Sequence, residues 1–180
     1  MLLIKPYIRE RAVEYARRWA LSRNPLFTDF TGQGGNCTNF VSQCVLAGSC
    51  TMNYTQTFGW YYISSSDRAP SWTGVEFFYD FMTRNTDGVG PFMREVRRWE
   101  LEIGDVIQLA NDEGDYYHTL IVSKIEGAVI YVCAQSNDAL DRRLSTYDYV
   151  SARYLHVEGV RVQFNDAGCF EGLIEGEVLP

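Results

Sequence analysis

The stretch that decides the fold is TGQGGNCTNFVSQCVLAG, residues 31–48. Three glycines make its first half a flexible loop, and its second half repeats apolar side chains at helical spacing. Relative to Cys37, these side chains lie at positions +3, +4, +7 and +8: Phe40, Val41, Cys44 and Val45. We expect a helix that begins at Cys37, with Asn36 as its N-cap and Gly48 at its end. Cys37 then lies on the buried stripe, at the open end of the helix.

A thiol in the first turn of a helix occupies a position that favours its anion. The N–H groups there are unpaired and the helix dipole is positive, so a thiol pKa falls by about one unit or more from about 8.5. The same N–H groups can stabilise an oxyanion once a thiolate attacks a carbonyl. Cys37 is therefore a candidate nucleophile, and the alternative is a small packing residue, as free cysteine often is.

A cysteine nucleophile needs a base, and the chain has two histidines. His118 opens the predicted strand HTLIV directly after the acidic loop NDEGDYY, where a strand start leaves the ring at the edge of a cleft. His156 lies between Leu155 and Val157 in a predicted strand, a position typical of a structural or surface histidine. We expect His118 to be the base.

A third group should orient the imidazole from the neighbouring strand. The segment CAQSND ends that strand and offers Gln135, whose amide oxygen can accept from the ring N–H. Asn137 and Asp138 are the alternatives, and Asp138 is the stronger of these electrostatically. Gln135 could equally be an ordinary polar residue at a strand end.

Composition excludes several function classes. The net charge is −7 and the arginine pairs lie apart among acidic residues, so we expect no nucleic-acid partner. No apolar run approaches the roughly 20 residues that span a membrane. Five cysteines without a CxxC motif suit a reducing compartment, so we expect no structural disulfide. No metal site is expected, because neither histidine neighbours a cysteine pair, and no cofactor is expected either.

The N-terminal residues lack a signal-peptide pattern, because their apolar run is short and charged residues follow. Two locations stay open: the protein stays in the cytoplasm, or it is released or exported by another route.

We expect helices over 8–22 and 75–86, which come before the strands of an antiparallel sheet. The four predicted strands are 105–110, 116–125, 128–134 and 153–162. The fold class is therefore α+β, with a domain over 1–162 and an acidic tail of uncertain order over 163–180.

Several blocks together resemble a known family: AVEYARRWALSRNPLF, GGNCTNFVSQCVLAG, GDVIQL, HTLIV and AQSND…RRLSTY, within about residues 7–160. They look like the bacterial "putative amidase" domain family, which belongs with papain-like cysteine hydrolases and is similar to NlpC-type and CHAP cell-wall peptidases. The resemblance implies Cys37 as nucleophile, His118 as base, and a cysteine helix packed on an antiparallel sheet. It also suggests peptidoglycan stem peptides as the substrate class.

The chain departs from this family at two positions. Asn36 stands where the family usually has an acidic residue, which changes capping. Gln135 stands where a histidine is common, which leaves the orienting group open. The resemblance also suggests Gln33, just upstream of the cysteine, as an oxyanion donor, and an ordinary loop residue fits that position equally well. The first-turn N–H of Thr38 is a second candidate donor, by its place at the helix start.

Trp60 and Trp72 lie in an aromatic-rich connection and could line a substrate groove, although aromatic residues lie more often in the core.

Three functions are consistent with these residues. The first is a cysteine amidohydrolase that cleaves peptide-like amides through a thioester at Cys37. The second is a binding module on the same fold, for which the glutamine at position 135 is the best support. The third is an acyltransferase, in which an amine replaces water at the thioester. The sequence does not separate the third from the first, and it leaves the oligomeric state open.

Overall fold

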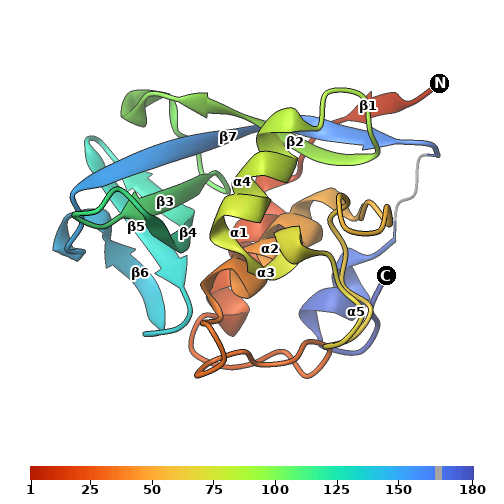
Figure 1. The fold of residues 1–180 in the computed structure, drawn as a ribbon, viewed down its shortest axis with the longest axis horizontal. Coiled ribbons are helices and arrows are strands. Elements are labelled where there is room, and N and C mark those ends of the chain that lie inside the picture. Colours follow the sequence, from red (N-terminus) through yellow and green to blue (C-terminus); the bar gives the residue numbers. More distant parts are fainter. Residues whose placement is uncertain (165–167) are drawn as a thin grey trace.

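A computed structural model describes residues 1–164 and 168–180 (Figure 1). The helices are α1 (Arg9–Trp19), α2 (Cys37–Ser49), α3 (Pro70–Thr73), α4 (Val75–Arg84) and α5 (Phe170–Ile174), with 3-10 turns at Arg98–Glu100 and Leu144–Thr146. The strands are β1 (Leu3–Lys5), β2 (Gly90–Val96), β3 (Val106–Ala110), β4 (Tyr116–Glu126), β5 (Val129–Ala134), β6 (Ala139–Arg143) and β7 (Ser151–Val162). Over these described ranges, no helix has the length and apolar character needed to cross a membrane.

The strands form one antiparallel sheet in the order β1-β7-β3-β4-β5-β6, and β2 also pairs with β7. The predicted neighbours 105–110, 116–125 and 128–134 correspond to β3, β4 and β5, and they are consecutive as expected. The strand predicted at 153–162 is β7, which pairs with β1, β2 and β3. The α+β class predicted from the sequence is therefore confirmed.

The central strands are buried on both faces, because their side chains alternate between two cores. On one face, Val106, Ile121 and Cys133 pack against the helices. On the other face, the neighbouring residues of the same strands join a smaller core with Leu144; they are Ile107, Leu120 and Val132. In Figure 1 the sheet curves around the helices, with β7 along the top and β3 to β6 at the left.

Helix α2 lies in the middle of the helical layer (Figure 1), and every residue from Thr38 to Ser49 is buried. Its polar side chains in the first two turns bond to buried neighbours. Asn39 Oδ1 accepts from Trp72 Nε1 at 3.0 Å, and Ser42 Oγ accepts from Trp60 Nε1 at 3.1 Å. These bonds fix the aromatic connection 49–74 against the helix.

The end of α2 differs from the prediction. The helix continues through Gly48 and is terminated by Cys50, which adopts the left-handed conformation with φ of 48°. Gly48 is required for packing instead, because a Cβ there would lie 2.4 Å from a ring carbon of Tyr7. The first helix also ends earlier than expected, at Trp19, and the short strands β1, β2 and β6 were not predicted.

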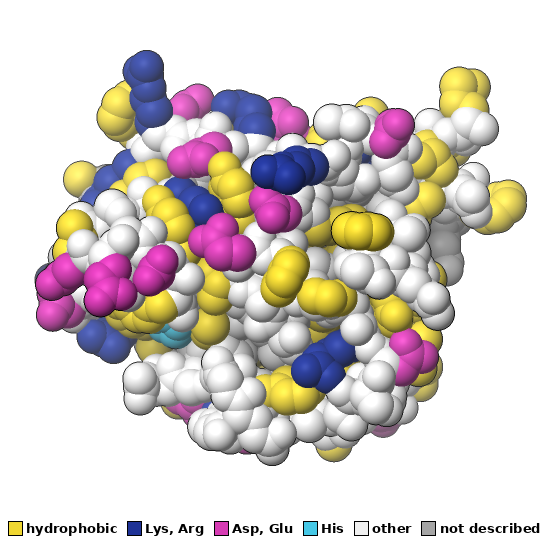
Figure 2. Space-filling view, viewed as in Figure 1, with side chains coloured by type: hydrophobic (Ala, Val, Ile, Leu, Met, Phe, Trp, Pro, Cys, Tyr) yellow, Lys and Arg dark blue, Asp and Glu magenta, His cyan; other side chains and the backbone are white. Residues whose placement is uncertain are grey.

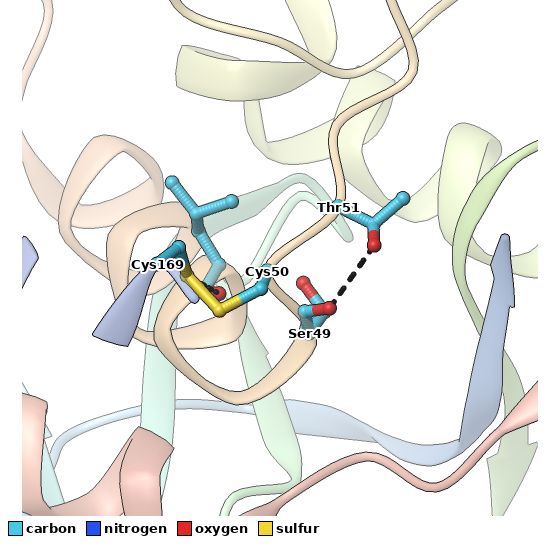
Figure 3. Close-up of a disulfide and its surroundings, with 5 residues drawn as sticks. Ser49, Cys50, Thr51 and Cys169 are labelled. Carbon is cyan, nitrogen blue, oxygen red and sulfur yellow. Dashed lines mark hydrogen bonds between the residues drawn. A yellow bond between two sulfur atoms is a disulfide. The ribbon is translucent and has the colours of Figure 1, made fainter. Parts of the chain in front are cut away.

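The expectation of no structural disulfide is wrong, because Cys50 is joined to Cys169 (Figure 3). The two Cα atoms lie 5.5 Å apart although the residues are separated by 119 positions. The pair forms because α5 packs at the C-terminal end of α2, and the absence of a CxxC motif does not exclude a bond between such distant segments. Cys37, Cys44 and Cys133 are free.

The segment predicted as a tail of uncertain order contributes to the core in its second half. Phe170, Leu173 and Ile174 of α5 are buried, and the Ile174 carbonyl accepts from Trp19 Nε1 at 2.9 Å. Residues 165–167 of the predicted tail lie outside the described residues.

Replacing Cys169 with serine should lower the free energy of unfolding by about 2–5 kcal/mol, because the unfolded chain loses a cross-link that closes a long loop. Urea unfolding of the oxidised and reduced protein checks this, with the Cys169→Ser variant beside them. Reductant should destabilise the wild type and have no further effect on Cys169→Ser. An oxidised protein in which all five cysteines are alkylated under denaturing conditions would contradict the pairing.

Candidate active site

Cys37 is the first residue of α2, as predicted, and its side chain is half-buried. The loop before it turns through Gly34 and Gly35, whose φ values of 96° and 101° are ones that other residues rarely adopt. The glycines therefore shape the turn that delivers the thiol to the helix start.

Asn36 occupies the N-cap position, but its side chain does not cap the helix. Its Oδ1 accepts from the Phe30 N–H at 3.0 Å and from Asn39 Nδ2 at 2.8 Å. Among the hydrogen bonds of the described residues, none uses the backbone N–H groups of residues 37–39. These three donors lie at the positive end of the helix dipole without a described partner; Thr38 and Asn39 are buried, and Cys37 is half-buried.

Gln135 is buried and supports Asn36. Its Oε1 accepts from Asn36 Nδ2 at 2.6 Å, while its Nε2 donates to the carbonyls of Trp19 and Ser22 at 2.7 and 2.8 Å. None of its described hydrogen bonds reaches His118. These contacts differ from the expected orienting role, because the amide holds the residue before the thiol and not the imidazole.

Two further bonds tie the start of α2 to the sheet. The Asn36 N–H donates to Ser136 Oγ at 2.9 Å, and the hydroxyls of Thr38 and Thr119 are 2.9 Å apart. Cys37 is therefore flanked on both sides by residues bonded to the end of β5 and the start of β4. His118 directly precedes Thr119, so the structure brings together the two segments that carry the candidate nucleophile and base. Side chains alternate along the strand, however, so Thr119 faces α2 whereas His118 lies on the face of the smaller core with Leu109.

The pair of threonine hydroxyls belongs to a buried row of hydrogen-bonded side chains. Thr119 Oγ1 accepts from Gln108 Nε2 at 3.3 Å, and Gln108 Oε1 accepts from Arg153 Nε at 2.8 Å. The Arg153 guanidinium lies between the rings of Tyr79 and Tyr116, 3.6 and 3.8 Å from their centroids. The sequence alone did not predict this row of hydrogen-bonded side chains, because only the strand register shows which residues are neighbours.

His118 is the third residue of β4 and pairs with Leu109 of the smaller core. Its ring is stacked on Tyr117 at a centroid distance of 6.1 Å and lies 5.9 Å from the ring of Tyr147. Burial and the nearby Arg142 charge lower the pKa of His118 from 6.5 to about 4, so the imidazole is neutral at neutral pH and able to accept a proton.

The thiol and the imidazole are not hydrogen-bonded to each other in this arrangement. The described polar neighbour of Cys37 Sγ is the Thr38 hydroxyl, at 3.8 Å. A contact within about 4 Å between the sulfur and His118, which proton transfer needs, stays a prediction.

The other predicted site residues have varied surroundings. Asp138 binds Arg23 through both oxygens at 3.0 Å, and Asn137 is exposed in the left-handed conformation, so neither has a described bond to His118. Gln33 is exposed on the turn before Cys37.

The expectation that Trp60 and Trp72 line a groove is wrong. Both side chains are fully buried, with their rings 4.8 Å apart and their N–H groups bonded to α2, so they belong to the core. Over the described residues, no three His, Cys, Asp or Glu side chains gather as metal ligands would.

From the low pKa of His118 we predict how the free energy of unfolding changes with pH. The folded state holds the ring neutral down to about pH 4, whereas the unfolded chain takes up the proton near pH 6.5. The unfolded state therefore binds more protons between these values, and stability falls as the pH drops through this window, by at most about 3 kcal/mol. Urea unfolding at neutral and acidic pH should show a smaller loss for His118→Gln than for the wild type. Equal losses in both proteins would contradict the depressed pKa.

Comparison with known proteins places the chain in a family. A family model described as "Putative amidase domain" matches residues 6–157. A curated protein of Bacillus subtilis (strain 168), "Uncharacterized protein YhbB", is 34% identical over 147 residues, which cover 79% of this chain and 45% of that protein. The chain thus spans less than half the length of this relative, and no solved structure matches. Because the family match covers most of its length, the chain belongs to the "Putative amidase domain" family.

Proposed function

We propose that this protein is a cysteine amidohydrolase on a papain-like fold, with Cys37 as nucleophile and His118 as base. One observation carries the proposal most of all. The Asn36 side chain accepts from the Phe30 N–H and from the Asn39 side chain instead of capping the helix, so the N–H groups of residues 37–39 have no described partner beside a half-buried thiol. A thiol next to three free donors is the arrangement that covalent attack on a carbonyl requires.

In the first half of the reaction, neutral His118 takes the thiol proton as Cys37 Sγ bonds to the carbonyl carbon of the amide. The carbonyl electron pair moves onto oxygen, and the N–H groups of residues 37–39 hold the resulting oxyanion. Gln33, exposed on the preceding turn, is a further candidate donor. When the oxyanion collapses, the C–N bond breaks, His118 gives its proton to the leaving nitrogen, and a thioester remains on Cys37.

In the second half, His118 takes a proton from water as the water oxygen attacks the thioester carbon. The C–S bond then breaks, the acid product leaves, and the proton on His118 returns to the sulfur. His118 starts each half without a proton because its ring is neutral at neutral pH, although a pKa of about 4 makes it a weaker base than an ordinary histidine.

We propose that the His118 ring is oriented by groups other than the Gln135 amide that the sequence suggested. Gln135 is engaged with Asn36, and Asp138 with Arg23, so no amide or carboxylate is placed at the ring by the described contacts. The rings of Tyr117 and Tyr147, which flank His118, are the groups that we propose hold its orientation.

Peptide-like amides are the proposed substrate class, and peptidoglycan stem peptides the preferred members of it. Membership in an amidase family supports amide cleavage, while the similarity to cell-wall peptidases that the sequence blocks suggest supports the narrower choice. The Cys50–Cys169 disulfide fits work outside a reducing cytosol, because such bonds persist in oxidising compartments.

Incubation with purified peptidoglycan in ¹⁸O-labelled water tests the proposal. Each cleaved amide should yield a new carboxyl group with one ¹⁸O atom, and acid quenching should trap an acyl group on Cys37. The Cys37→Ala variant should lose both signals, and His118→Ala should lose about 10²- to 10⁴-fold in rate.

The His156→Gln variant serves as control, since His156 is bonded to Asp105 in another part of the sheet. It should keep its activity. Unlabelled acyl products formed with an added amine would favour the acyltransferase, and undiminished cleavage by Cys37→Ala would overturn the cysteine mechanism. Binding without any cleavage would favour the binding module.

The pH dependence should reflect the unusual histidine. As the pH falls, His118 gains its proton only near pH 4 and then no longer serves as base. The value of kcat/KM should therefore hold through pH 6.5 and fall on the acid side with an apparent pKa near 4. A rate profile measured on any cleaved peptide amide checks this, and an acid limb centred near 6.5 would show that burial does not depress the histidine.

A further inference from the structure

Arg142 of β6 is a half-buried arginine whose guanidinium is held in place from one side. Its Nε donates to Thr146 Oγ1 at 2.8 Å and one terminal nitrogen donates to the Thr146 carbonyl at 2.9 Å. Its Cζ lies 3.9 Å from the ring centroid of Tyr147. The bonds to Thr146 use two of the five N–H groups of the guanidinium, so donors remain beyond them on the side of Tyr147.

The position of Arg142 relates it directly to the candidate base. Tyr147 contacts both side chains, since its ring lies under the guanidinium and 5.9 Å from the His118 ring. The cation is close enough to contribute to the low pKa of His118. Arg142 and His118 therefore lie around the same aromatic side chain.

Arg142 also lacks an acidic partner, in contrast to arginines elsewhere in the chain. Arg17 pairs with Asp141 and Arg23 with Asp138. Within the part of the chain that the structure describes, no carboxylate lies within ion-pair distance of Arg142. The protein carries a net charge of −7, and acidic side chains gather on the left of the face in Figure 2, over the sheet. The unpaired state of Arg142 is thus not due to a shortage of carboxylates.

This charge opposes the proposed reaction unless something neutralises it. During acylation His118 becomes an imidazolium, and a nearby guanidinium raises the free energy of that state. A carboxylate of the substrate that bound Arg142 would offset the repulsion at the moment when the proton moves. Arginine suits this role because its planar fork binds carboxylates through paired hydrogen bonds.

We propose that Arg142 binds a carboxylate of the substrate beside the amide bond that is cleaved, and so selects acidic peptide-like amides. The proposal rests on the proposed function, since it assumes that Cys37 and His118 carry the reaction. Arg142 acts as a specificity residue for the same site.

Two alkylating agents of nearly equal size test this without a known substrate. Iodoacetate carries a carboxylate and iodoacetamide is its neutral counterpart, and both transfer their carbon to a thiolate with loss of iodide. The measured quantity is the ratio of their rate constants at Cys37, from peptide mass mapping of the folded protein at neutral pH. The matched control for Arg142→Met is Arg143→Met, which removes the neighbouring, exposed charge.

Arg142→Met should lower the iodoacetate-to-iodoacetamide ratio by about tenfold, the effect of one charged hydrogen bond. Arg143→Met should leave the ratio near that of the wild type, and Arg142→Lys should keep part of the preference. If Arg142→Met fails to fold, the wild-type ratio itself should fall as salt rises to about 0.5 M, because salt screens the attraction.

The outcomes separate the two proposals. If Cys37 reacts with both reagents but Arg142→Met changes their rates equally, Arg142 only holds the turn at Thr146 and the specificity proposal is overturned. If Cys37 reacts with neither reagent faster than a small free thiol does, the nucleophile itself is absent and the proposed function fails. A lowered ratio in Arg142→Met alone supports the carboxylate site.

Discussion

Helix α2 is enclosed on every side, and this burial requires the polar side chains of its first two turns to find protein partners. Gln43 bonds to Tyr15, Ser42 to Trp60 and Thr38 to Thr119, so one helix fixes α1, the aromatic connection and the sheet. Loss of one partner in such a pair costs about 1–3 kcal/mol, because the other is left buried and unsatisfied. The positions of the surrounding elements therefore follow from the polar residues of α2.

The open end of the same helix follows from an exchange of hydrogen bonds. An asparagine at this position usually caps the helix, yet Asn36 bonds instead to Phe30, Asn39 and Gln135. The first-turn N–H groups lose a capping partner, while the loop and the end of β5 gain an anchor. A rigid support and free donors therefore arise from one side chain, which is what a preorganised anion site needs.

The sequence was informative where a pattern is local and strong. The start of α2 and the hairpin strands β3 to β5 were predicted because helical spacing and alternating burial repeat over many residues. Strand β1 pairs only with the distant β7, whereas β6 forms a local hairpin with β5; both were missed because a stretch of three to five residues carries too little pattern to stand out.

Contacts between distant segments were equally out of reach. Cys50 meets Cys169 only because α5 packs on α2, and no spacing rule relates them. Gln135 was correctly placed at a strand end, but its side chain faces the helix layer and Asn36, which depends on the register of β4 and β5. The two tryptophans show the same difficulty, since an aromatic cluster in a loop has the same composition whether it lines a groove or fills a core.

Strand β7 has a consequence for how the chain reaches this structure. It pairs with β1, β2 and β3, yet it is formed by residues 151–162, so most of the sheet is synthesised before the strand that joins these three exists. The pairing of Leu3 with Val162 joins segments from nearly opposite ends of the chain. Such non-local pairing gives a high contact order, which slows folding because loop closure precedes any stabilising contact. Until β7 arrives, the edges of β2 and β3 remain unpaired on that side, and such unpaired edges expose a nascent chain to aggregation.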